Sequence, residues 1–189
     1  MTRLAAWMAI GVLALAACGG GDDDGEAQSG DTEWANNICQ AADDVGSSLS
    51  GLTDAIKVDT NNPSNAVEEA KGEMSDRLES VQQSVEDLAK AIGDLPAGTD
   101  AEIQSAAGDL SDATEQLHSN VDNLSSAASK VADANNVQEL TAALPAASAA
   151  LKSTQNSLSA ITTDISGYVD SADQALKQAF DDAEACQSS

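Results

Sequence analysis

The chain has 189 residues, which is enough for one domain of ordinary size, and its formal net charge is −24. A surface this acidic repels phosphate backbones and anionic lipid headgroups, so no nucleic acid is expected as a partner. Leu, Ile, Val and Phe make up about 17% of the residues from Cys18 onward. With a high net charge, a content below about 20% is typical of disordered chains, so a fold must be indicated by the residue pattern instead.

Residues 1–17 have the features of an export signal. Arg3 precedes an apolar stretch that ends at Ala17 and is too short for a membrane span, which needs about 20 residues. Leu15-Ala16-Ala17-Cys18 resembles the lipobox of bacterial lipoproteins. The resemblance implies that the signal peptide is removed and that the Cys18 sulfur carries a diacylglycerol, which anchors the protein at the extracytoplasmic face of the cell membrane. The alternatives are an ordinary secretory signal beside a spare cysteine and an uncleaved membrane helix.

Residues 18–31 are predicted to be a flexible, acidic tether. Three glycines are followed by Asp22, Asp23 and Asp24, and glycines and like charges favour an extended, mobile chain. A calcium site is the alternative. The segment lacks the alternating acids and the distal Glu of an EF-hand loop, so a hydrated tether is the interpretation that we prefer.

From residue 32 to 189, apolar and small residues recur three and four positions apart, a spacing that predicts helices. The first helix is expected over residues 32–57. Asn62 and Pro63 are suited to begin the second helix as N-cap and first helical residue. That helix is expected to end near Gly93.

The third helix has the most regular pattern. Its apolar positions from Ile103 to Val131 alternate steps of four and three residues, as in the seam of a helical bundle. A short helix is then expected over residues 137–144 and ends at Pro145, and a long last helix runs to Cys186. The predicted domain is residues 32–189.

The pattern predicts an all-α fold, namely an elongated antiparallel four-helix bundle with up-down-up-down topology and a short extra helix. The four main helices come out unequal, at roughly 26, 31, 35 and 42 residues. The first therefore cannot cover the last over its whole length. Either residues 137–144 fill part of the gap, or one end of the bundle is a three-helix stalk.

Cys39 and Cys186 are predicted to form a disulfide. An exported chain with two cysteines besides the lipidated one favours a bridge, and in this topology the start of the first helix and the end of the last helix lie together. The bridge would close the bundle. The alternatives are two buried free thiols and a metal site, for which no histidine is nearby in the sequence.

The sequence contains few candidates for catalysis or metal binding. Glu115 and His118 have the spacing of a di-iron carboxylate motif, but His118 is the only histidine and both residues fall beside the helix seam. An exposed pair is therefore expected. Asp43 and Asp44 are adjacent, so on a helix they point about 100° apart and do not form a catalytic dyad. We expect no catalytic residues, no metal and no cofactor.

Three aromatic residues fall on or beside the helical stripes, and we expect them in the core: Trp34, Tyr168 and Phe180. The opening helix, Trp34-Ala35-Asn36-Asn37-Ile38-Cys39, together with the lipobox and acidic tether, resembles small helical lipoproteins of high-GC Gram-positive bacteria. The resemblance does not indicate any particular activity.

Two functions remain open. The first is a lipid-anchored, non-catalytic bundle of the cell envelope that acts as an interaction or spacer module, with membrane contact through the lipid on Cys18 and a protein partner in the envelope. The alternative is an extracytoplasmic ligand-binding or sensory accessory lipoprotein with a pocket between helices, either near Tyr168 or beneath the seam of small residues. An exposed apolar strip would favour the first function and a large internal pocket the second. The oligomeric state and the biological process are not indicated.

Overall fold

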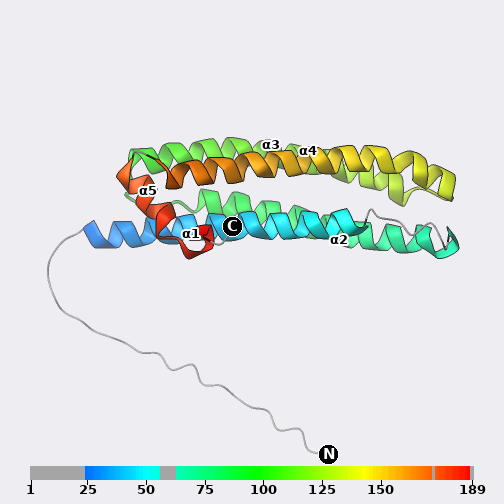
Figure 1. The fold of residues 1–189 in the computed structure, drawn as a ribbon, viewed down its shortest axis with the longest axis horizontal. Coiled ribbons are helices and arrows are strands. Elements are labelled where there is room, and N and C mark those ends of the chain that lie inside the picture. The colour runs from blue at the N-terminus through cyan, green and yellow to red at the C-terminus, as the bar shows by residue number, and fades with distance from the viewer. Residues whose placement is uncertain (1–23, 56–62, 172, 188–189) are drawn as a thin grey trace, which may run out of the picture.

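The computed structural model describes residues 24–55, 63–171 and 173–187. Every regular element in this part of the chain is helical, which confirms the all-α prediction. Figure 1 shows four long helices side by side in antiparallel order, with α5 crossing one end of the bundle. The elements are α1 (Asp24–Ala55), α2 (Pro63–Gly93), α3 (Ala101–Ala132), α4 (Val137–Val169), α5 (Gln174–Asp181) and the 3-10 helix η1 (Glu184–Gln187).

The four long helices are nearly equal, with 32, 31, 32 and 33 residues. At 1.5 Å per residue each is about 48 Å long. The predicted mismatch in length is therefore wrong, and the bundle needs no three-helix stalk. The difference comes from the two ends of α4 and from the earlier start of α1.

Pro145 lies inside α4, so the predicted break at this residue is wrong. Proline removes one backbone hydrogen bond, here the one to the Thr141 carbonyl, but both residues are exposed and water can bind that carbonyl instead. The helix start is also well fixed. The Asn136 side chain accepts a hydrogen bond from the Glu139 N–H at 2.9 Å, and the Glu139 carboxylate accepts one from the Asn135 N–H at 2.8 Å.

The predicted long helix up to Cys186 is also wrong, because α4 ends at Val169. The side chain of Asp173 accepts a hydrogen bond from the Leu176 N–H at 2.9 Å and so caps a new helix, α5. The apolar residues of α5 keep the spacing of α4, which is why the sequence pattern did not reveal the break. Leu176, Ala179 and Phe180 are buried at the end of the bundle instead of extending the seam.

The helix α1 begins at Asp24, so residues 24–31 are helical. The sequence had predicted a flexible tether over these residues. The loop between α2 and α3 packs against this first part of α1. A Cβ atom on Gly30 would lie 3.4 Å from the ring of Pro96, and the Thr99 hydroxyl donates a hydrogen bond to the buried Asp31 carboxylate at 3.2 Å. These contacts explain why the helix extends beyond the apolar pattern.

The core follows the predicted seam. In α3 every seam position from Ile103 to Val131 is buried, including Thr114, whose side chain is 3% exposed. Residues of α1, α2 and α4 complete a continuous apolar cluster along the bundle. The regular spacing therefore outweighs the low apolar content, because nearly every large apolar side chain is placed in the core.

Three aromatic side chains gather at the end of the bundle that α5 covers. The rings of Trp34 and Phe180 are 5.7 Å apart in an edge-to-face arrangement, and those of Tyr168 and Phe180 are 5.3 Å apart. The Trp34 indole N–H donates a hydrogen bond to the Ile92 carbonyl at 3.2 Å. Because Ile92 is in the last turn of α2, its carbonyl has no partner within the helix, and Trp34 supplies one. The prediction that these aromatics lie in the core is confirmed for Trp34 and Phe180, whereas Tyr168 is half-buried.

The titration of Asp31 gives a first test. Burial raises the pKa of the Asp31 carboxyl and Asp100 raises it further, while the hydrogen bond from Thr99 lowers it. Because the folded-state pKa is the higher one, the contribution of Asp31 to stability is present at low pH and is lost as the pH rises above the ordinary value of 3.8. In D31N the free energy of unfolding at pH 7 should exceed that of the wild type, and the difference should shrink toward pH 4. Urea denaturation followed by circular dichroism measures it.

The exposed Glu33 is the matched control for Asp31. The E33Q variant removes a nearby negative charge without removing a buried carboxylate, so its stability should follow that of the wild type across the pH range. Equal behaviour of D31N and E33Q would show that burial of Asp31 has no energetic cost.

The only tyrosine gives a second test. Burial raises the pKa of Tyr168 to about 12, with further contributions from the charges of Asp109 and Asp164. The native protein should therefore form tyrosinate, measured by absorbance at 295 nm, with a midpoint near 12, whereas the urea-unfolded chain should titrate near 10. The free energy of unfolding should fall as the pH rises from 10 to 12, because only the unfolded chain has lost this proton. A native midpoint near 10 would contradict the burial of Tyr168.

Candidate functional site

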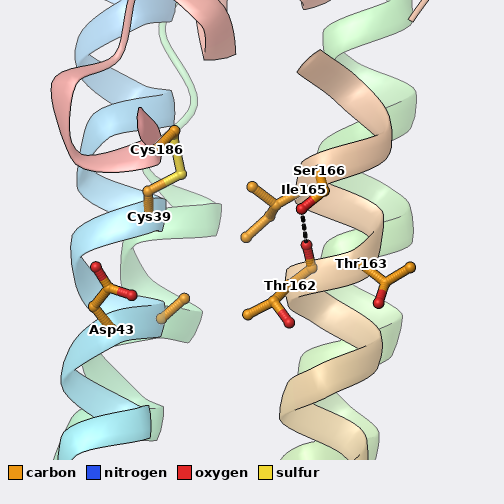
Figure 2. A pocket seen from close by; sticks show the side chains of 8 residues that line it. Cys39, Asp43, Thr162, Thr163, Ile165, Ser166 and Cys186 are labelled. Carbon is orange, nitrogen blue, oxygen red and sulfur yellow. Dashed lines mark hydrogen bonds between the residues drawn. A yellow bond between two sulfur atoms is a disulfide. The ribbon is translucent and has the colours of Figure 1, made fainter. Parts of the chain in front are cut away.

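The described surface has a groove between α1 and α4. Its volume is about 470 Å³, within the range of small-molecule pockets. Figure 2 shows α1 on one side and α4 on the other, with the disulfide at the upper edge. The lining residues are Cys39, Ala42, Asp43, Thr162, Thr163, Ile165, Ser166 and Cys186.

The groove exists because α1 and α4 are held apart at one end and meet further along. At the end of the bundle, α5 contacts both helices and η1 contacts α1 (Figure 1). Further along, a Cβ atom on Gly46 would lie 3.7 Å from Leu158, and the Gln155 amide donates a hydrogen bond to the Thr53 hydroxyl at 3.3 Å. The space between these two regions is the groove.

The Cys39–Cys186 disulfide forms one edge of the groove. The bridge joins residues 147 positions apart in the sequence, with their Cα atoms 5.2 Å apart, and confirms the predicted pairing. Cys39 is 3% exposed, and the Ala185 N–H donates a hydrogen bond to the Asn36 side chain at 2.9 Å. One covalent bond and one hydrogen bond thus fix η1 against α1.

The hydroxyl groups on the α4 side of the groove are hydrogen-bond acceptors toward its interior. The Ser166 hydroxyl donates its proton to the Thr162 carbonyl at 2.8 Å, and the Thr162 hydroxyl donates to the Ser159 carbonyl at 3.1 Å. Each hydroxyl oxygen keeps lone pairs for another partner after donating its one proton to the helix backbone. Figure 2 shows Thr162, Ile165 and Ser166 pointing toward α1, whereas Thr163 points away from it.

The α1 side contributes one charged group and one small apolar group. Asp43 and Ala42 are one turn of helix beyond Cys39. Asp43 and Asp44 are both exposed, but only Asp43 is among the lining residues, as expected for adjacent positions that point about 100° apart on a helix. Of these two neighbouring carboxylates, only that of Asp43 therefore lines the groove.

Glu115 and His118 lie outside this groove, on the α2–α3 side of the bundle. Both are exposed, as expected, and they border a smaller concavity of about 230 Å³ together with Ala89, Ser111 and Thr114. Within the described residues, no group of three or more His, Cys, Asp or Glu side chains is close enough to hold a metal ion. This pair therefore gives no metal centre in that part of the chain.

The remaining predicted sites stand as follows. Cys18, the predicted lipidation site, lies outside the described residues. Tyr168 does not line the groove, and its hydroxyl donates a hydrogen bond to the Ala106 carbonyl at 3.4 Å. No described helix is both long enough and apolar enough to cross a membrane.

Sequence reasoning missed Asp43, Thr162 and Ser166 as site residues. Thr162 and Ser166 are four positions apart beside Ile165, so their common helical face could have been recognised. The contribution of Asp43 on the opposite wall could not be recognised, because the groove depends on the turn that leads from α4 into α5.

The disulfide gives a third test. Replacing both cysteines, in C39S/C186S, removes a cross-link that closes a loop of 147 positions and should lower the free energy of unfolding by about 2–5 kcal/mol. Denaturant unfolding of the wild type with and without reductant measures the same effect, and C18S is the control that should leave stability unchanged. Peptide mapping under non-reducing conditions should find Cys39 joined to Cys186. Free thiols at both positions would contradict the geometry.

Comparison with known proteins identifies no relative. No protein family matches the chain. Neither the curated proteins nor the solved structures include a significant match.

Proposed function

We propose that the protein is a lipid-anchored, non-catalytic helical bundle at the extracytoplasmic face of the cell membrane, where it acts as a spacer or interaction module. We base this chiefly on the Cys39–Cys186 disulfide. Structural disulfides persist in oxidising compartments outside the cytoplasm, and this pairing leaves Cys18 as the one remaining cysteine. That cysteine follows directly after the signal-like segment and is available to carry the lipid.

The geometry of the bundle suits a spacer. Five residues separate Cys18 from the start of α1 at Asp24, which is a reach of at most about 18–20 Å. The helices then extend the molecule by about 48 Å. In this arrangement the half of the bundle that carries the aromatic residues and the disulfide lies toward the membrane, and the turn between α3 and α4 lies farthest from it.

The described surface favours polar interactions over apolar ones. Among the described residues, the only large apolar side chain that is exposed is Val137, at 36%. An apolar strip, which would have favoured docking of a partner helix, is therefore not found on that surface. A protein partner in the envelope would meet an acidic surface, and we expect basic groups on such a partner.

The groove between α1 and α4 favours the second candidate function, ligand binding. The described residues that line it provide one carboxylate, several hydroxyl oxygens and apolar carbon around a volume of about 470 Å³. A lipid-anchored accessory protein that binds a small molecule would use such a site. The two functions are compatible, because the groove occupies only part of the surface.

The anchor gives a fourth test. In cells of a lipoprotein-producing bacterium, the wild type should incorporate labelled palmitate and sediment with the membranes. The C18A variant should lose the label and move to the soluble fraction, because two acyl chains provide stable anchoring and the remaining chain is acidic and polar. The control is C39S/C186S, which keeps Cys18 and should stay in the membrane fraction. A C18A protein that still sediments with membranes would contradict the proposed anchor.

A further inference from the structure

We propose that the groove between α1 and α4 binds a small organic ammonium ion, namely a primary amine with a compact apolar body. This inference rests on the ligand-binding candidate above and names its ligand class. It does not depend on the lipid anchor. Three features of the groove carry it: the acceptor character of its polar groups, its apolar wall, and its charge.

The polar groups that face the groove match the donors of an ammonium group. A protonated primary amine has three N–H donors and no acceptor. Asp43 on α1 offers a carboxylate, and Thr162 and Ser166 on α4 offer hydroxyl oxygens whose protons are donated to their own helix backbone. These lining groups accept hydrogen bonds, so a ligand with N–H donors matches them and a ligand with acceptors alone does not.

The rest of the lining suits a compact apolar body. Ile165 points into the groove from α4, and the disulfide sulfurs form the edge (Figure 2). Ala42 of α1 is also among the lining residues. The volume of about 470 Å³ accommodates a molecule larger than ammonia or a single water. Burial of the apolar body would add to the affinity that the ammonium group provides.

The charges around the groove favour a cation over an anion. None of the described residues that line it is basic. The sequence of α1, from Asp24 to Ala55, contains seven acidic and no basic residues, and the whole chain carries −24. The resulting negative potential raises the local concentration of cations and repels carboxylates and phosphates.

A divalent metal ion fits this groove less well than an organic cation. Calcium takes six to eight oxygen ligands, usually with several carboxylates, and magnesium also binds through carboxylates in a strict octahedral geometry. Asp43 is the single carboxylate among the described residues that line the groove. No cluster of three or more metal-binding side chains occurs within residues 24–55, 63–171 and 173–187.

The test uses 2-phenylethylammonium chloride as the probe, with the uncharged 2-phenylethanol as its counterpart. Both are titrated into the ¹⁵N-labelled full chain at low salt, and amide chemical shifts are followed by NMR. We expect saturable shifts that centre on residues 42–43 and 162–166 with the amine, and binding at least tenfold weaker with the alcohol.

Asp43 and Asp44 provide a matched pair of variants. Each of D43N and D44N removes one charge from the same turn of α1, but only Asp43 lines the groove. We expect D43N to weaken binding of the amine about tenfold and D44N to leave it within about twofold. T162V, which keeps the side-chain shape and removes the hydroxyl oxygen, should weaken binding several-fold.

The outcomes distinguish a specific site at Asp43 from general attraction to the acidic surface. Equal loss of binding in D43N and D44N would mean that the amine is attracted to the acidic surface in general, and it would overturn the proposed site. No saturable shifts with the amine, or equal binding of the alcohol, would also overturn it. Because the anchor is measured by palmitate incorporation at Cys18, failure of either proposal can be recognised without the other.

Discussion

The Cys39–Cys186 cross-link is the constraint on which the rest of the structure depends. It fixes the last turn of the chain to α1, 147 positions away in sequence, and so requires the chain to leave α4 and cross the end of the bundle. That crossing brings Phe180 between Trp34 and Tyr168, where it closes the core. It also holds α1 and α4 apart at that end, which opens the groove. Closure of the core and formation of the groove therefore have the same cause.

The core contains many small and polar side chains, so the cross-link is important for stability. Two of the seam positions are threonines, and the Thr114 hydroxyl is buried without a hydrogen-bond partner among the described residues, whereas the Thr154 hydroxyl donates to the Ala150 carbonyl. Polar contacts also replace apolar ones between helices, as between Ser48 and Ser84 at 2.9 Å. Small side chains let helices approach closely but bury little apolar area. A cross-link that restricts the unfolded chain adds stability without requiring more apolar surface.

The sequence patterns predicted the features that follow from the spacing of apolar residues and from the order of the helices. The α3 seam, with Leu110 and Leu117 at its centre, was predicted because a regular heptad over eight turns has no other simple interpretation, and the disulfide followed from antiparallel topology. The ends of α4 were not predicted. Pro145 normally ends a helix, but here its cost falls on an exposed turn, and the phase of the apolar residues continues unbroken from α4 into α5. The groove lies beside the break between α4 and α5, so the place of Asp43 in its lining was not predicted.

The position of the groove along α1 determines which charges act on a ligand there. In the proposed anchored arrangement, Asp43 is about 19 residues, or roughly 28 Å, from the start of α1 near the membrane. Electrostatic interactions are screened over about 8 Å at physiological ionic strength. Lipid headgroups are therefore too distant to influence the groove, and its potential comes from the acidic residues of the protein itself. A cation bound between α1 and α4 would also reduce the repulsion among those acidic residues, so binding and bundle stability should be coupled.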